Sequence, residues 1–188
     1  KNGNIRRNQL SDFTNIRQNG KIAMKLNEED ELVSVIPCGD TDNILLATRL
    51  GKAIRFDVHD VRVFVGRGSS GVRGIRLKPN DYVVSMSLIP NLENRFILSV
   101  TENGFGKRTP IEDYRMTNRG GQGVANIECS TRNGPVVASY VASEDDQIML
   151  VTNSGKLIRR RVHGGEGDSI RIAGRKTQGV RLFDVEED

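Results

Sequence analysis

The chain has 188 residues, of which 36% are apolar, and its formal net charge at pH 7 is +4. This length suits one ordinary domain with a sizeable core, and no uncharged apolar stretch is long enough for a membrane-spanning helix. The two cysteines, Cys38 and Cys129, lie far apart, which excludes a disulfide-dense scaffold and a four-cysteine zinc site and favours a reduced, cytoplasmic setting. The first residues lack the apolar run of a secretory signal.

Glycine is abundant, at 20 residues, and it punctuates a pattern that repeats along the chain. Residues 44–55, 97–108 and 148–159 align without gaps on the pattern Ile-x-x-x-Thr-x-x-Gly-x-x-x-Arg. Residues 3–7 carry the second half of the same pattern. Because the copies recur about every 50 residues, the chain contains four copies of one structural element.

Each copy predicts the same order of strands. A branched apolar run, a tight glycine turn and a returning strand predict a β-hairpin, and a polar segment follows it. A second glycine then opens a strand, and a β-rich run closes the cycle. The strand-opening glycines are Gly20, Gly71, Gly123 and Gly179. The closing runs are 32–36, 82–86 and 136–141.

Four strands per repeat predict an all-β fold. A four-stranded antiparallel unit cannot bury both of its faces alone, so we expect the units to pack radially as propeller blades. The prediction is one incomplete domain over 1–188, with repeat units at about 3–50, 51–103, 104–154 and 155–188. No closure between the two ends is evident in the sequence.

Six stretches in this order and spacing resemble the C-terminal domain of DNA gyrase A, the β-pinwheel, more than its topoisomerase IV paralogue. They are 10–20, 42–56, 71–77, 100–114, 119–123 and 154–159. The resemblance implies a propeller-like β-pinwheel of six blades with DNA bent around a basic rim, and this chain would supply roughly the last four. One departure is that the signature box Gln-Arg-Arg-Gly-Gly-Lys-Gly has its nearest counterpart at 117–123, with four matches in seven.

The resemblance also implies a function. The chain would be a non-catalytic DNA-binding and wrapping module of a type IIA topoisomerase, which lets the ATP-driven holoenzyme of gyrase A and gyrase B introduce negative supercoils. It would hold no cofactor, metal or catalytic residue and would lie in the bacterial cytoplasm, at the nucleoid. Because the family places its DNA-cleaving tyrosine outside this domain, Tyr82, Tyr114 and Tyr140 are interpreted as packing residues. The alternatives are a propeller-like protein-interaction scaffold or the topoisomerase IV C-terminal domain.

Basic side chains at repeat-equivalent positions are candidates for neutralising phosphates, because phosphate contacts dominate the affinity for DNA. The first row is an arginine at one position in all four copies: Arg7, Arg55, Arg108 and Arg159. The second row precedes the strand-opening glycines: Arg67, Arg119 and Arg175, with Arg17 one place nearer in the first copy. The candidate DNA-binding residues are Arg6, Arg7, Arg17, Lys52, Arg55, Arg67, Arg73, Lys107, Arg108, Arg119, Lys156, Arg159, Arg160 and Arg175. The acidic residues fall in other turns, at 28–31, 40–42, 93, 144–146 and 186–188. A basic band on one edge and an acidic band on another are therefore predicted.

The first arginine row has an alternative role. A repeat can also preserve one internal arginine–carboxylate pair per blade, with Asp12, Asp60 and Asp113 as the candidate carboxylates. The G-x-G-x-x-G match at 66–71 is followed by a predicted strand and not by a helix, so it is interpreted as a loop. His59 and His163 fall in different repeats, which argues against a shared metal site.

Overall fold

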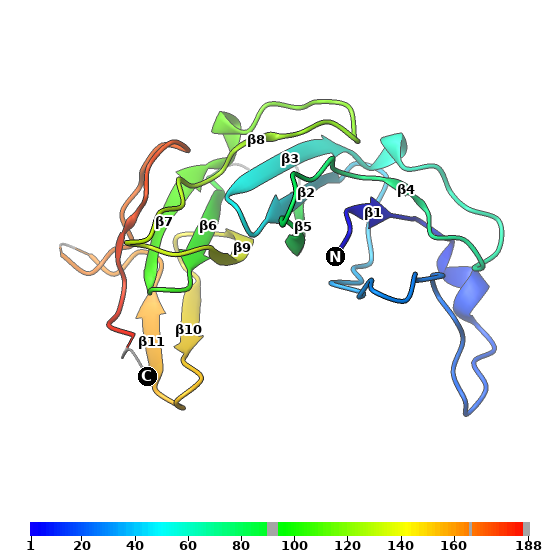
Figure 1. Cartoon of the computed structure of the whole chain (residues 1–188), viewed down its shortest axis with the longest axis horizontal. Coiled ribbons are helices and arrows are strands. Elements are labelled where there is room, and N and C mark those ends of the chain that lie inside the picture. Colours follow the sequence, from blue (N-terminus) through cyan, green and yellow to red (C-terminus); the bar gives the residue numbers. More distant parts are fainter. Residues whose placement is uncertain (90–93, 166, 186–188) are drawn as a thin grey trace.

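The computed structural model describes residues 1–89, 94–165 and 167–185. The chain forms an arc of β-sheet units that follow one another around an open centre (Figure 1). Apart from three single 3₁₀ turns, η1 (Leu10–Phe13), η2 (Val58–Asp60) and η3 (Ile111–Asp113), the elements of this part are strands. The prediction of an all-β fold is confirmed, and no helix in the described ranges is long and apolar enough to span a membrane.

Two units are complete four-stranded antiparallel sheets. Blade I has the order β5-β2-β3-β8 and blade II the order β9-β6-β7-β12, with β5 and β9 toward the centre of the arc (Figure 1). Blade I consists of β2 (Asn43–Thr48), β3 (Lys52–Asp57), β5 (Val83–Ile89) and β8 (Val124–Ala125). Blade II consists of β6 (Phe96–Thr101), β7 (Phe105–Pro110), β9 (Val136–Ala142) and β12 (Val180–Arg181).

Two smaller units flank these blades. The N-terminal unit pairs β1 (Asn4–Ile5) with β4 (Val72–Arg73), and the C-terminal hairpin pairs β10 (Gln147–Val151) with β11 (Leu157–Arg161). Both pairs are antiparallel. The three hairpins predicted from the repeat, β2–β3, β6–β7 and β10–β11, are confirmed.

Each repeat gives one strand to the repeat before it. The strand opened by Gly71 is β4, and it pairs with β1 of the preceding repeat. In the same way β8, opened by Gly123, pairs with β3, and β12, opened by Gly179, pairs with β7. This exchange ties consecutive repeats together through backbone hydrogen bonds.

The repeated Thr-x-x-Gly shapes the hairpin turn. The Thr48 hydroxyl accepts a hydrogen bond from the Lys52 amide at 3.2 Å, and the Thr152 hydroxyl accepts one from the Lys156 amide at 3.0 Å. Gly51 has φ +81°, a left-handed conformation that costs other residues about 1–2 kcal/mol. The sequence pattern therefore encodes the turn locally.

The core lies between the units rather than within one of them. One apolar cluster joins the N-terminal unit to blade I, a second joins blades I and II, and a third joins blade II to the C-terminal hairpin. In the second cluster Leu45 and Ala47 of blade I pack with Ile97 of β6 and with Tyr114, which follows η3. Strands between two neighbours are thus covered on both faces, as the uniform burial of β6 shows.

Two predicted strands do not form. The segment opened by Gly20 and the run at 32–36 have no strand assignment. In the blades, the equivalent of the first pairs with a β3-type strand of the preceding repeat, and the equivalent of the second, β5, pairs with β2. The described chain contains neither partner for this first repeat, and an isolated segment does not hold a strand without a ladder.

A polar seam joins blades I and II near the centre of the arc. The Ser85 hydroxyl donates to the Ser139 carbonyl at 2.9 Å and accepts from the Ser139 amide at 3.2 Å. Beside it, the Tyr114 hydroxyl donates to Asn126 Oδ1 at 2.6 Å. Burial raises the pKa of Tyr114, so its hydroxyl stays protonated. This tyrosine is therefore a packing residue of the core.

Candidate functional site

Three members of the first arginine row lie within strands, Arg55 in β3, Arg108 in β7 and Arg159 in β11, and the first two contact the next repeat. Arg108 is only 4% exposed; its Nε donates to the Ile170 carbonyl at 2.8 Å and its Nη1 to Glu144 at 3.2 Å. Arg55 donates to the carbonyls of Ile111 and Tyr114. These two guanidiniums connect one repeat to the next.

The carboxylate partners of this row differ from the predicted ones. Arg7 pairs with Asp40 at 3.5 Å, and Arg108 pairs with Glu144, so the idea of a paired arginine is right for these two copies. The partner comes from the turn before the next hairpin, and not from Asp12, Asp60 or Asp113. The equivalent residue for Arg55 is Glu93, which lies outside the described residues, as do the acidic residues 186–188.

In two copies, the basic residue directly before a member of the first row binds the glycine-rich loop of the next repeat. Lys107 is fully buried, and its ammonium donates to the carbonyls of Gly174 and Arg175 and to the Thr177 hydroxyl. Burial lowers the pKa of Lys107 to about 8. Arg6 holds residues 66–69 in the same manner, through three backbone carbonyls.

The predicted role of Lys107 and Arg108 as DNA contacts needs correction on this geometry. Neither side chain reaches the surface, because the loop of the next repeat covers both of them. Nothing in the local sequence indicates this burial, since a basic pair on a strand is ordinarily solvated.

Three arginines of the second row make the same kind of contact with the preceding repeat. The Nη1 atoms of Arg67, Arg119 and Arg175 donate to backbone carbonyls at 2.9, 2.9 and 3.0 Å. The acceptors are Ile22, Arg73 and Ala125, each two residues after a strand-opening glycine of the preceding repeat. These half-buried guanidiniums fasten each loop to the repeat before it while keeping part of their surface in solvent.

The remaining predicted cations are distributed over several elements. The exposed ones are Arg17, Arg73, Lys156 and Arg159, and the half-buried ones are Lys52 and Arg160. Arg160 donates to the Leu182 carbonyl at 2.8 Å, and Lys156 donates to the Asp184 carbonyl at 3.1 Å.

A third arginine row was not predicted from the sequence. Parallel bridges place Val63, Met116 and Ile172 at one repeat position, each beside a member of the first row. The residues just before them are Arg62, Arg115 and Arg171, and all three are exposed. We call these three the outer row.

The outer row follows a buried apolar anchor in each repeat. The anchors are Val61, Tyr114 and Ile170, each 1% exposed. In the first two copies the anchor's amide caps a 3₁₀ turn, η2 or η3, at 3.1 and 3.0 Å. The sequence signal that could have identified this row is an apolar residue directly followed by arginine at one repeat position in three repeats.

The turns that carry the outer row follow one another along the convex outer side of the arc (Figure 1). None of the ion pairs found within the described ranges includes a member of this row. Arg62 also lies over the Phe64 ring, with 4.3 Å between the guanidinium carbon and the ring centroid. The row therefore offers positive charge to solvent at a regular interval.

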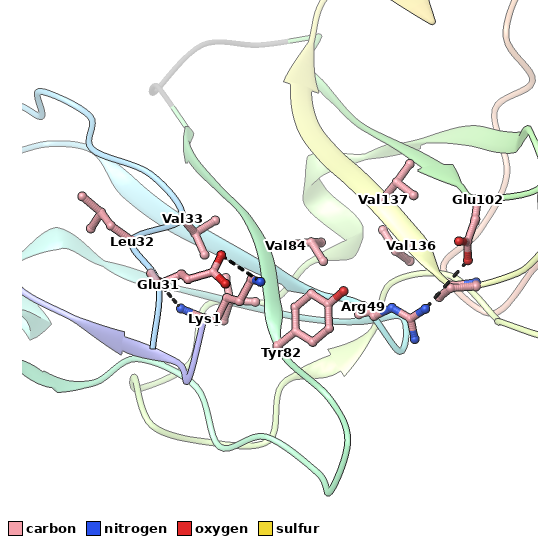
Figure 2. A pocket seen from close by; sticks show the side chains of 12 residues that line it. Lys1, Glu31, Leu32, Val33, Arg49, Tyr82, Val84, Glu102, Val136 and Val137 are labelled. Atoms are coloured by element: carbon pink, nitrogen blue, oxygen red, sulfur yellow. Dashed lines mark hydrogen bonds and ion pairs between the residues drawn. The ribbon is translucent and has the colours of Figure 1, made fainter. Parts of the chain in front are cut away.

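The cavity near the inner end of the blades has a different character (Figure 2). Its volume is about 360 Å³, and valines from three repeats line it. Lys1 pairs with Glu31 at 2.8 Å and Arg49 pairs with Glu102 at 3.8 Å, with the Tyr82 ring between the two cations. Because each of these two cations has a carboxylate partner, the attraction of this cavity for an anionic ligand is reduced.

The two histidines lie in different repeats and have separate partners. His59 lies beside Asp57 at 2.9 Å, whereas His163 contacts the Ser169 hydroxyl in a different repeat. Within residues 1–89, 94–165 and 167–185, no cluster of three or more histidine, cysteine or acidic side chains is arranged to hold a metal ion.

Comparison with known proteins gives consistent results at the level of sequence and structure. The family described as "DNA gyrase C-terminal domain, beta-propeller" matches residues 1–39, 42–90, 95–134 and 146–188. The A subunit of DNA gyrase from Rickettsia prowazekii is 40% identical over 99% of this chain and 25% of its own length. The Staphylococcus epidermidis protein of the same name is 40% identical over 97% of this chain and 20% of its own.

Two solved structures share the fold closely. A DNA gyrase A C-terminal domain superposes with a TM-score of 0.83 and 29% identity, over 99% of this chain and 60% of that one. A topoisomerase IV C-terminal domain gives a TM-score of 0.88 and 26% identity, over 97% and 55%. The chain spans only about a quarter of the length of the Rickettsia protein that it matches. Since the family match extends over nearly all of its residues, the chain belongs to the family of the DNA gyrase C-terminal domain, a beta-propeller.

Proposed function

We propose that this chain binds and bends duplex DNA along its convex edge, through the outer row Arg62, Arg115 and Arg171. It acts as the wrapping module of gyrase A and contributes no catalytic residue. Together with the rest of gyrase A and with gyrase B, it directs ATP-driven strand passage toward negative supercoiling.

The observation that carries the proposal is the exposed arginine at one repeat position in three successive repeats, carried by turns on the outer side of the arc. Exposed arginines neutralise phosphates and release condensed counterions, and this term needs no particular base sequence. A row on a convex surface contacts a duplex at successive points only if the duplex follows the curve. DNA bending therefore follows from the placement of the row, at a cost of several kcal/mol that the added contacts must offset.

The second arginine row supports the same path. Arg67, Arg119 and Arg175 lie in loops that belong to the same repeats as the outer row, and their remaining guanidinium surface adds positive charge. Because each Nη1 is bound to a backbone carbonyl, these arginines also hold the loops in place. We assign them a positioning role beside the outer row.

A salt titration tests the outer row. The triple variant Arg62→Ala, Arg115→Ala, Arg171→Ala is compared with a control triple variant, Lys25→Ala, Lys78→Ala, Arg132→Ala, which removes three exposed cations outside the row. The slope of log K against log salt is expected to flatten by about 2.7 for the first variant, at about 0.9 per lost phosphate contact. The control should change the slope little, and equal losses in the two variants would contradict the proposal.

Wrapping needs its own measurement, because binding alone does not show bending. A nicked plasmid ligated in the presence of the protein changes its linking number only if the duplex is wrapped. We expect a shift with the unmodified chain and none with the outer-row variant. Binding without any shift would leave the chain a DNA-binding domain that does not wrap, and negligible binding at low salt would favour a protein-interaction scaffold.

A further inference from the structure

The residue directly after each outer-row arginine is apolar and exposed. Val63, Met116 and Ile172 are 39%, 45% and 49% exposed, although each has a large hydrophobic side chain. A single exposed hydrophobic residue is ordinary on a protein surface and needs no explanation. Here the same repeat position is apolar and exposed in three successive repeats, which is a pattern. We call these three residues the apolar row.

The backbone of the apolar row is held by the preceding repeat. Its members form parallel β-bridges with Arg7, Arg55 and Arg108. In each copy the amide of the following residue donates to the carbonyl of the bridged arginine, at 2.8, 2.9 and 3.0 Å. The three side chains therefore leave from backbone that is already in place, so a ligand that contacts them orders no loose loop at this position.

The exposure of this row is a property of the complete blades. Tyr114 is buried in the apolar cluster that joins blades I and II, whereas Met116, two residues later, lies outside that cluster. Both blades are four-stranded sheets, so Met116 has its neighbours on either side. A polar residue would fit at this half-open position, yet the chain carries an apolar one in all three repeats.

Arginines flank the apolar row on both sides along the chain. An outer-row arginine precedes each member and a second-row arginine follows it by three or four residues, as in Arg115, Met116 and Arg119. Consecutive residues of extended backbone point to opposite sides, so the outer-row arginine and the apolar side chain of one repeat diverge. Each repeat thus offers positive charge and a separate apolar contact on the convex side of the arc (Figure 1).

Bent duplex DNA has a surface that matches this combination. Its phosphate backbones flank a minor groove about 6 Å wide, and proteins that bend DNA place apolar side chains in this groove beside basic ones. The major groove, in contrast, accepts a helix or a two-stranded ribbon. The turns η2 and η3, which precede the row in the first two copies, are single 3₁₀ turns and do not provide such an element.

We infer that the apolar row packs into the minor groove of the bent duplex, between phosphates that the outer row and the second row neutralise. The inference rests on the proposed function and adds a second kind of contact to it. The arginines set the salt dependence of binding, whereas the apolar row supplies a part of the affinity that does not depend on salt. Burial of the exposed part of three hydrophobic side chains favours that contact.

The triple variant Val63→Ser, Met116→Ser, Ile172→Ser tests the row by duplex binding over a salt series. We expect binding about tenfold weaker at a fixed salt concentration, because less apolar surface is buried. The slope of log K against log salt should stay unchanged, because the phosphate contacts remain. An unchanged slope also shows that the arginines are still in place, and circular dichroism checks the fold.

A control triple variant removes exposed apolar side chains elsewhere. It is Leu50→Ser, Val137→Ser, Met149→Ser, at positions that are 41%, 51% and 62% exposed. We expect this variant to bind DNA as the unmodified chain does. If the apolar-row variant fails to fold, Met116→Gln alone replaces it, with an expected loss of about twofold to threefold.

Inosine in place of guanine identifies the groove, because it removes only the amino group that guanine places in the minor groove. The unmodified chain should bind an inosine duplex several-fold tighter than the matched guanine duplex. That preference should shrink in the apolar-row variant and persist in the control variant.

Three results would overturn this inference while leaving the proposed function intact. They are tight binding by the apolar-row variant, a loss of its affinity that comes only from a flatter salt slope, and an inosine preference equal to that of the unmodified chain. Failure of the proposed function has a different signature: the outer-row variant and its own control then lose equal slope, or the unmodified chain does not bind, and this inference fails with it.

Discussion

Blade I and the C-terminal hairpin are built from the same repeat pattern, yet their side chains have opposite environments. Leu45 of β2 is 1% exposed, whereas Met149 at the same position of β10 is 62% exposed. Likewise β6 of blade II is buried at every residue, while β10 and β11 alternate between exposed and half-buried residues. The repeat sequence thus specifies a hairpin, and the neighbouring units decide what that hairpin buries.

The same contrast applies to charge. Arg108 in blade II is buried against the next repeat, and Arg159, its equivalent in the C-terminal hairpin, is exposed. Both lie opposite the third residue of the preceding strand, Leu98 or Met149. An arginine at one repeat position is therefore a structural residue in one copy and a surface cation in another.

Truncating these two arginines should give the largest difference. Arg108→Ala removes the bond to the Ile170 carbonyl and leaves a cavity in place of a buried side chain, and we expect a loss of about 3–5 kcal/mol in the free energy of unfolding. Arg159→Ala should cost less than about 0.5 kcal/mol, as exposed substitutions do. Denaturant unfolding of both variants measures the difference, and similar losses would refute the structural role of Arg108.

The turn glycines of blade I and of the C-terminal hairpin also have different surroundings. An added Cβ on Gly51 would collide with the Ile127 carbonyl oxygen, whereas one on Gly155 meets nothing within 4 Å, and both have positive φ. We expect Gly51→Ala to cost about 3 kcal/mol and Gly155→Ala about 1 kcal/mol, the second being the conformational penalty alone. If thermal unfolding gave equal shifts for the two variants, the segment that follows β8 would not pack against the blade I turn.

The buried ammonium of Lys107 should make stability depend on pH. Its pKa is lowered from 10.5 to about 8, so the folded state disfavours the charged form. Below pH 8 the charged ammonium lowers the free energy of unfolding. That free energy increases as the pH rises from 8 toward 10.5. Between about pH 7 and pH 9.5 this increase is about 2 kcal/mol, at about 1.36 kcal/mol per unit of pKa shift.

Replacing Lys107 by methionine should abolish that rise in stability, because no titrating group then remains at the site. Lys52→Met, at a half-buried position of β3 in blade I, should leave the rise unchanged. Urea unfolding at several pH values distinguishes the two, and a pH dependence that survives in Lys107→Met would assign it to another group.

The turn threonines should show the smallest effect. Thr48→Val removes the acceptor of the Lys52 amide at a fully buried site, and we expect a loss of about 1 kcal/mol. Thr152→Val acts at a half-buried turn, where water replaces the hydroxyl, and should cost less than about 0.5 kcal/mol. Hydrogen exchange of the Lys52 and Lys156 amides reports each bond directly.

The hairpins were predictable because their signal is local: a branched run, a threonine cap and a left-handed glycine within a few residues. The exchanged strands were predictable as strands at Gly71, Gly123 and Gly179, but their partners were not, since each pairs far back in the sequence. The missing strand at 32–36 follows from the same dependence on a partner.

The candidate site was less predictable than the fold. Basic residues at equivalent positions pointed to Arg108 and Lys107, but the sequence does not show that a loop more than 60 residues later covers them. The outer row, in contrast, has a local sequence signal, an apolar residue followed by arginine at one repeat position, as in Tyr114 and Arg115. Exposure depends on the neighbouring repeat, and that neighbour is set by tertiary pairing.

Strand exchange also has a consequence for synthesis on the ribosome. Lys52 of β3 pairs with Ala125 of β8, so blade I cannot be completed until roughly 70 further residues have been made. Domains fold as their segments emerge, so each blade in this arc would wait with one open edge for the next repeat to be translated. Translation speed across a repeat would then set how long that edge is available to other chains.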